Sequence, residues 1–341
     1  MDDRTGAGTA LARARAGEAL VYSGDYHNAR QLLAAMSRRL ARAFPVGGAD
    51  PLAVFRAERR LRAAESAVLS RLAVPVAPGW RIALRRAPDV AAACEEALGP
   101  SPGGPGLLPL RELLGIVGAH EWRRRGVPVP ALGARIHPHF GVFAPIRGEY
   151  VELLAAEVAA RPPAGRRAFD VGTGTGVLAL VLARAGAEVV ATDADPRAAA
   201  CARENAERLG LAARIRVVEA DLFPEGRADL VVSNPPWIPA APHSALDRAV
   251  YDPGGSFLER LVLGLPAHLA PEGEAWIVLS DLSERIGLRA PGEVARLAAR
   301  AGLRADAIRT VRPAHPRARD PDDPLHAIRS QETIVLYRLV P

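Results

Sequence analysis

The sequence contains no lysine, so all 44 of its basic residues are arginine. Alanine, glycine and proline are abundant, which indicates a biased codon supply in which arginine has replaced lysine. The arginines are interleaved with 38 acidic residues, and only short clusters such as Arg38-Arg39, Arg59-Arg60 and Arg123–Arg125 interrupt this mixing. The net charge of +6 is therefore weak evidence for a nucleic-acid partner. We expect ordinary solvated faces, and a nucleic-acid surface stays open as the alternative.

Cysteine and long apolar runs are also scarce. Cys94 and Cys201 lie far apart in alanine-rich stretches, a pattern that favours small buried side chains over a disulfide. No stretch approaches the ~20 apolar residues of a membrane span, and the acidic N-terminus lacks a signal-peptide pattern. These absences predict a cytoplasmic protein without a membrane partner, and they leave the oligomeric state open.

The length of 341 residues exceeds the roughly 100–200 residues of one domain and predicts two. Residues 1–135 have a helical pattern, clearest over 26–44, where apolar residues recur every three or four positions. Further helices are expected at 51–73 and 87–98. The Gly/Pro-rich residues 99–106 predict a surface loop or linker. We place the domain boundary after residue 135.

Residues 136–341 alternate short β-branched runs with longer Ala/Leu-rich runs, which is typical of a parallel sheet covered by helices on both faces. Strands are expected at 166–171, 188–193, 214–220, 228–233, 274–280, 305–311 and 332–339. Helices are expected at 175–185, 196–209, 256–269 and 290–302. The fold class is therefore α/β, a mostly parallel seven-stranded sheet with a C-terminal antiparallel hairpin, preceded by a helical domain.

A glycine-rich loop follows the first of these strands. It runs Asp170-Val171-Gly172-Thr173-Gly174-Thr175-Gly176 and opens a helix, and its glycines allow a tight turn and a close approach of backbone to a ligand. Dinucleotide-binding folds use similar loops, so this motif alone leaves nucleotide and adenosylmethionine binding equally open.

Acidic residues end the next two strands. Asp193, followed by Ala194, lies about twenty residues after the glycines, where a carboxylate accepts hydrogen bonds from both ribose hydroxyls. Capping of the following helix is the alternative role, and Asp195, directly before Pro196, fits that role better. Asp221, followed by Leu222, ends the third strand and is expected to accept from an adenine amino group.

With these motifs in order, residues 137–341 resemble the class I, Rossmann-like S-adenosylmethionine-dependent methyltransferases. The resemblance implies S-adenosyl-L-methionine as cofactor, with Gly172, Gly174 and Gly176 against its methionine part. It implies Asp193 on the ribose and Asp221 near the adenine. The cofactor-binding set that we expect comprises Phe143, Pro145, Arg147, Asp170, Gly172, Thr173, Gly174, Thr175, Gly176, Asp193, Ala194, Asp221, Leu222 and Asn234.

The run Asn234-Pro235-Pro236-Trp237 follows the apolar strand 228–233, at the sheet edge that carries the glycine-rich loop. Two prolines fix the backbone and leave carbonyls without competing amide donors. The Asn234 oxygen and one such carbonyl can accept hydrogen bonds from the two protons of a planar amino or amide group. The Trp237 ring can pack against the face of that group. In isolation the run would be read as a turn with a buried Trp. In this context we predict that the catalytic residues are Asn234, Pro235, Pro236 and Trp237. The motif resembles the amino-methylating branch of the superfamily.

Upstream, His137 to Arg147 resembles the segment that covers the cofactor, with Phe143, Pro145 and Arg147 as its candidates. His137 and His139 lack a third ligand at sensible spacing, so a structural or lid role is expected and no metal site.

The residues most resemble the release-factor glutamine N5-methyltransferases, whose motif is Asn-Pro-Pro-Tyr and which also pair a helical domain with this catalytic domain. Trp237 departs from their Tyr, and the lead-in 145–149 and the longer N-terminal part depart as well. We therefore expect N-methylation of a planar amide or amino nitrogen on a protein or metabolite, with residues 1–135 as a substrate-recognition or accessory domain. A nucleic-acid adenine N6-type methyltransferase and a non-catalytic cofactor-binding module are the alternatives.

Overall fold

The computed structural model describes residues 1–48, 50–242, 246–314 and 316–341. The chain divides into two compact units, Met1–Arg124 and Arg125–Pro341. The segment 125–135, assigned above to the first domain, belongs by its contacts to the second unit, because Val127, Val129 and Leu132 are buried in that unit's core.

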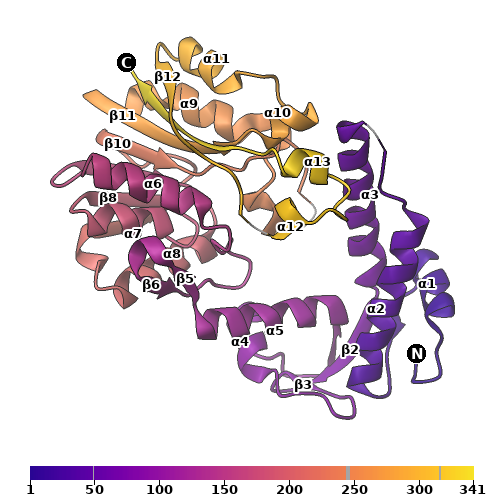
Figure 1. Cartoon of the computed structure of the whole chain (residues 1–341). Helices are drawn as coiled ribbons and strands as arrows, with labels where there is room; N and C mark the ends of the chain where they lie inside the picture. The colour runs from indigo at the N-terminus through magenta and orange to yellow at the C-terminus, as the bar shows by residue number, and fades with distance from the viewer. Residues whose placement is uncertain (49, 243–245, 315) are drawn as a thin grey trace. The chain divides into compact units, whose positions relative to one another are not determined.

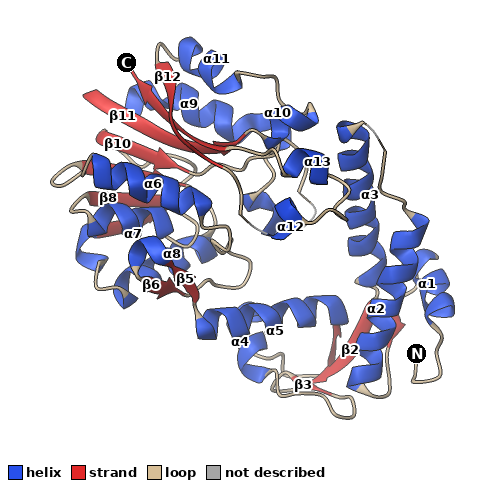
Figure 2. Cartoon of the chain, in the orientation of Figure 1, coloured by secondary structure: helices blue, strands red, loops and turns tan. Residues whose placement is uncertain are grey.

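The first unit combines helices with a small sheet (Figure 2). Its helices are α1 (Ala7–Arg15), α2 (Tyr26–Ala43), α3 (Pro51–Leu69), α4 (Ala91–Leu98) and α5 (Leu110–Arg125), which ends at the boundary. Its strands are β1 (Leu20–Val21), β2 (Leu72–Ala77), β3 (Arg81–Ile82) and β4 (Gly106–Pro109). Asp25 and Asp50 cap α2 and α3 by accepting from His27 N and Leu52 N.

The helices predicted at 26–44, 51–73 and 87–98 correspond to α2, α3 and α4, of which α4 begins only at Ala91. The prediction of 51–73 as one helix was wrong beyond Leu69, because the chain turns there and enters β2. Strand β2 is buried on both faces over most of its length and contains Pro75, so it lacks the alternation that identifies a strand in a sequence.

The second unit is a helix-covered sheet. Its first elements are β5 (Val127–Val129), η1 (Pro130–Leu132), β6 (Ala134–Ile136), α6 (Glu149–Ala160), β7 (Arg167–Val171), α7 (Val177–Arg184), β8 (Glu188–Asp193), α8 (Pro196–Arg208), η2 (Ala212–Arg214), β9 (Ile215–Glu219) and β10 (Ala228–Ser233). They are followed by η3 (Leu246–Ala249), η4 (Pro253–Gly255), α9 (Ser256–His268), β11 (Leu269–Ser280), α10 (Leu282–Ile286), α11 (Glu293–Arg300), β12 (Arg304–Val311), α12 (Pro316–Arg319), α13 (His326–Arg329) and β13 (Ile334–Val340).

Seven strands of the described chain form one sheet in the order β12-β13-β11-β10-β7-β8-β9 (Figure 1). Neighbouring strands pair in parallel from β11 to β9, whereas β13 is antiparallel to both β11 and β12. The predicted seven-stranded fold with a C-terminal antiparallel hairpin is therefore confirmed.

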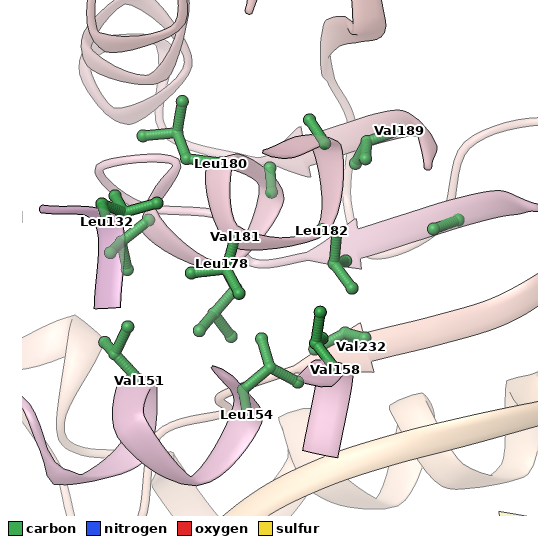
Figure 3. Close-up of a cluster of buried hydrophobic side chains, with 14 of the residues drawn as sticks. Leu132, Val151, Leu154, Val158, Leu178, Leu180, Val181, Leu182, Val189 and Val232 are labelled. Atoms are coloured by element: carbon green, nitrogen blue, oxygen red, sulfur yellow. The ribbon is translucent and has the colours of Figure 1, made fainter. Parts of the chain in front are cut away.

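Strand residues alternate between two hydrophobic cores, one on each face of the sheet. Ala168, Leu230 and Val232 face α6, α7 and α8, whereas Phe169 and Val231 face α9 and α11. Figure 3 shows the first core, where Val151, Leu154 and Val158 of α6 point toward Leu178, Val181 and Leu182 of α7. Such two-sided burial fixes the positions of the strand ends, where the loops begin.

Strand β7 lies between β10 and β8 inside this sheet and is the point where the strand order reverses. The chain continues from β7 to β8 on one side, and β10 lies on the other side. In open parallel sheets, ligands bind at the carboxyl ends of the strands beside such a reversal. The glycine-rich loop begins at the end of β7. Across the described residues, every helix is too short or too polar to cross a bilayer.

Candidate functional site

The loop after β7 has the backbone that its glycines allow. Gly172, Gly174 and Gly176 all have positive φ, at 73°, 55° and 82°. The N–H groups of Gly172 and Thr173 both donate to the carbonyl of Thr192 in β8, at 2.9 and 2.8 Å. These two hydrogen bonds hold the loop against the end of β8.

Asp170 is buried at the end of β7. Its Oδ2 accepts from Thr173 Oγ1 (2.6 Å) and from the backbone N–H of Ala179 (3.0 Å), which ties the loop to α7. Its Oδ1 has no hydrogen-bond partner among the described residues. Burial raises the pKa of Asp170 to about 6, and the negative charge of Asp193 adds to the rise. The wall of the site thus contains a buried acceptor atom without a donor.

Asp193 ends β8 and receives two backbone donors. Its Oδ2 accepts from Gly174 N and its Oδ1 from Asp195 N, both at 2.9 Å. Burial raises the pKa of Asp193, and these two hydrogen bonds oppose the rise. Asp195 caps α8 by accepting from Arg197 N, so its predicted capping role is confirmed.

A cavity of about 440 Å³ opens beside this loop. Among the residues predicted for cofactor binding, its wall contains Phe143, Asp170, Gly172, Thr173, Gly174, Thr175, Asp193, Ala194, Asp221, Leu222 and Asn234. One concave surface therefore collects residues from the ends of β7, β8, β9 and β10. Its volume lies in the range of about 300–1,000 Å³ that small-molecule sites have.

The end of β9 contributes a strained turn. Leu222 has φ 73°, and its carbonyl accepts from the Thr192 hydroxyl. Asp221 lines the cavity, but its side chain is 68% exposed and accepts from Arg260 Nη2 at 2.6 Å. Its predicted contact with an adenine amino group stays a prediction.

The segment before α6 contributes unevenly. Gly141, Val142 and Phe143 line the cavity, whereas Pro145 and Arg147 are absent from its described lining. Arg147 instead lies near the buried carboxyl of Glu332. Burial raises the pKa of Glu332, and the positive charge of Arg147 opposes this rise. The structure thus separates Phe143 from the other two candidates of this segment.

The two histidines upstream have local partners. His137 N donates to Asn205 Oδ1 (2.8 Å), and the ring of His139 contacts Glu204 through Nε2 (2.7 Å). Both contacts attach the segment to α8. Within the described part of the chain, no group of three His, Cys, Asp or Glu side chains is placed to hold a metal ion.

The run from Asn234 to Trp237 directly follows β10, and both Asn234 and Pro236 line the cavity. Trp237 Nε1 donates to Asn234 Oδ1 at 2.8 Å. Because an indole N–H only donates, the atom facing it is the amide oxygen, which sets the orientation of the Asn234 amide. The Trp237 indole packs against both hydrophobic cores, and its carbonyl accepts from the buried Ser283 hydroxyl at 2.6 Å.

Trp237 therefore lies behind Asn234 and is not part of the described cavity wall. The sequence suggested it as an aromatic face for the substrate; the structure gives it a contact that holds Asn234.

Several cavity residues escaped the sequence analysis, among them Tyr150 and Phe257. Tyr150 belongs to α6, a helix that the sequence analysis did not predict. Phe257 is placed by Asp252, whose buried carboxylate accepts from the N–H groups of Phe257 (2.9 Å) and Leu258 (3.2 Å) at the start of α9. The segment Asp252-Pro253-Gly254-Gly255, which directly precedes α9, carries that signal.

Part of the second unit matches a known protein family. Residues 134–285 match the family model described as methyltransferase small domain. A release factor glutamine methyltransferase from Geobacter sulfurreducens is 39% identical over 144 residues, which cover 38% of this chain and 49% of that protein. A second, from Moorella thermoacetica, is 34% identical over 54% of this chain and 65% of its own length.

A ribosomal protein L11 methyltransferase from Pelotomaculum thermopropionicum is 55% identical over 73 residues, or 20% of this chain and 24% of that protein. The chain spans about half the length of the first curated relatives that it matches. The family model lies wholly within the unit that contains the cavity.

Proposed function

Since this chain belongs to the class I methyltransferases through its domain at residues 134–285, we propose that it transfers a methyl group from S-adenosylmethionine to a planar amide or amino nitrogen. The observation that carries the proposal is the position of Asn234 and Pro236 in the wall of the same cavity as the glycine-rich loop and Asp193.

The residues of the cavity fit the cofactor. A methyl-bearing sulfonium, when bound, supplies an electrophilic carbon. Gly174 leaves open space where a side chain would stand, so backbone approaches the ligand there. The unpartnered Oδ1 of buried Asp170 offers an acceptor for an ammonium group, and Asp193 offers a carboxylate for ribose hydroxyls.

At the reacting end, the chain's own residues orient the acceptor nitrogen. The Asn234 oxygen has two lone pairs and gives one to Trp237, so the other accepts an N–H of the substrate. The carbonyls of the two prolines add acceptors on a rigid backbone. Acceptors that hold the hydrogens turn the nitrogen lone pair toward the methyl carbon and stabilise the charge that develops. This arrangement needs no strong base.

A protein acceptor is favoured by the names of the relatives, since release factors and ribosomal protein L11 are proteins. We propose that residues 1–135 recognise this acceptor and that the reaction takes place in the cytoplasm. Cys94 and Cys201 are both buried and form no disulfide in the described part of the chain, which suits a reducing compartment.

The test is to incubate the purified chain and cell extract with methyl-labelled S-adenosylmethionine and to fractionate protein, nucleic acid and small molecules. Label should enter a protein; on acid hydrolysis an N-methyl amide releases the label as methylamine, whereas an N-methyl amine keeps it on the amino acid. Asn234→Ala should lower the rate by about 100-fold, the effect of losing one transition-state contact of ~2.7 kcal/mol.

Label in RNA or DNA would replace the protein acceptor with a nucleic acid. Full activity of Asn234→Ala would refute the role of the motif. Tight cofactor binding with no labelled acceptor in any fraction would identify a non-catalytic module.

A further inference from the structure

The net charge of the chain is concentrated in two helices of the first unit. Helices α2 and α3 together contain eight arginines and two glutamates, a net charge of +6, which equals the net charge of the whole chain. Helix α2 contains no acidic residue. The net charge of all other residues together is therefore zero, although arginines and acidic residues are interleaved along the sequence.

These helices border a groove of about 640 Å³ within the first unit, the α2–α3 groove. Its lining comes from α2, α3 and the start of α5 and consists of His27, Arg30, Gln31, Leu33, Ala34, Ser37, Arg62, Glu65, Leu69, Arg111 and Leu114. Three arginines thus face one carboxylate across a floor of leucines.

The single carboxylate of this groove is already engaged. Glu65 is buried, and its two oxygens accept from Ser37 Oγ and Arg62 Nη1, both at 3.0 Å. Arg30 and Arg111 have no carboxylate partner among the described residues, and Arg111 Nη1 is shielded from solvent without any hydrogen bond. A buried charged donor without a partner costs free energy that an anion placed beside it recovers.

We propose that the α2–α3 groove binds an acidic, amphipathic segment of a partner protein. Carboxylates of that segment pair with Arg30 and Arg111, and its apolar side chains cover Leu33, Leu69 and Leu114. This is the mode in which a helix lies in a groove, with charge complementarity setting specificity. The binding requires neither cofactor nor methyl transfer, so it stands independently of the reaction proposed above.

The lining of the groove favours a protein over a nucleic acid. Single-stranded nucleic acids bind to basic grooves through bases stacked on aromatic side chains. The described lining contains no Phe, Tyr or Trp, and apart from His27, Gln31 and Ser37 its uncharged residues are aliphatic. Leucines match the apolar face of a peptide helix and offer bases no stacking surface.

The experiment measures binding of fluorescent probes to the full chain by anisotropy, without cofactor. The probe is a short helical peptide with leucines on one face and glutamates flanking them; the same peptide with glutamine for glutamate and a single-stranded RNA are the comparison probes. We expect binding of the acidic peptide that weakens with salt, and a loss of affinity of about tenfold in Arg111→Gln, as expected for one charged contact of ~1.4 kcal/mol.

Arg216→Gln is the matched control, because Arg216 is an exposed arginine of β9 in the other unit and its loss changes the net charge equally. Its affinity should equal that of the original chain. Arg30→Gln, at an exposed position, repeats the test without touching a shielded atom. Equal affinity of all variants, or equal binding of the glutamine peptide, overturns the proposal. Preference for RNA, lost in Arg111→Gln, overturns it in favour of a nucleic-acid groove.

Discussion

At the scale of single residues, the reacting end is organised by a contact within the run from Asn234 to Trp237. A Tyr in place of Trp237 has no indole N–H to donate, whereas Trp237 Nε1 donates to Asn234 Oδ1 at 2.8 Å. The contact fixes which edge of the Asn234 amide faces the cavity. Packing of the partly buried indole against two cores and the hydrogen bond from Ser283 to the Trp237 carbonyl hold the donor in place.

Trp237→Phe keeps an aromatic ring and removes this donor. We expect methyl transfer to fall about tenfold and the free energy of unfolding to fall by about 1–2 kcal/mol, the cost of one hydrogen bond and some packing. Cofactor affinity, measured by calorimetry, should not change. Trp122→Phe, at a Trp of α5 that is 44% exposed, is the control.

An independent measurement needs no substrate. In a ¹⁵N–¹H spectrum of Asn234→Ala, one of the four indole N–H signals should shift because its acceptor is gone. Unchanged indole signals would contradict the contact between Trp237 and Asn234.

Asp170 makes stability depend on pH. Its pKa rises from 3.8 to about 6 on folding, so the folded chain holds this proton more tightly than the unfolded chain. The free energy of unfolding therefore falls as pH rises from about 4 to about 6, by up to about 3 kcal/mol from this group.

Asp170→Asn removes this dependence and keeps an acceptor for Thr173 and Ala179. Denaturant unfolding at several pH values should show the variant gaining stability relative to the original chain between pH 4 and 6. A difference that is constant with pH would contradict the raised pKa.

At the scale of elements, two positions of the glycine-rich loop require glycine for different reasons. Gly176 packs on α8, where an added Cβ would lie 3.1 Å from the Cβ of Ala202 and 3.2 Å from its Cα. Gly174 has no heavy atom within 4 Å of that position and lines the cavity. One glycine serves packing between helices, and the other leaves room for a ligand.

Gly174→Ala should cost about 1 kcal/mol of stability, because its φ is positive, and lower cofactor affinity at least about tenfold. Gly176→Ala should cost more, about 2–4 kcal/mol, since backbone strain and a clash with α8 add. Gly287→Ala, at φ 82° in open space, has the same strain away from the cavity and should leave cofactor affinity unchanged. Thermal unfolding and calorimetry separate the three variants.

At the scale of the whole molecule, the core of the second unit includes the hairpin β5–β6. Val127, Val129 and Leu132 are buried there against α6 and α7. A fragment of residues 125–341 should therefore fold alone and bind S-adenosylmethionine with the affinity of the full chain. A fragment of 137–341 loses these three side chains and should be less stable by several kcal/mol, at about 1.5–3 kcal/mol for each.

Circular dichroism and calorimetry on both fragments check this expectation. Equal stability of the two fragments would place the domain boundary after residue 135, where the sequence pattern put it.

The sequence by itself determined the sheet, the limits of most of its strands and the position of the glycine-rich loop, whereas β11 begins at Leu269, five residues before the predicted start at 274. Two-sided burial gives parallel strands continuous apolar runs, and glycines and acids occur where these runs end, so β7 to β11 are readable without coordinates. Helix α6 and the hairpin β5–β6 were missed, because a nearly uniform apolar run and a three-residue strand carry no clear period.

Only the tertiary structure decided which side chains share a surface. It separated Pro145 and Arg147 from the cavity, placed Trp237 behind Asn234, and brought Phe257 into the wall through Asp252. It also brought Arg30 of α2, Arg62 of α3 and Arg111 of α5 to one groove. Contacts of this kind join residues far apart in the chain, and the spacing of residues along a sequence reports only periodicity within one element.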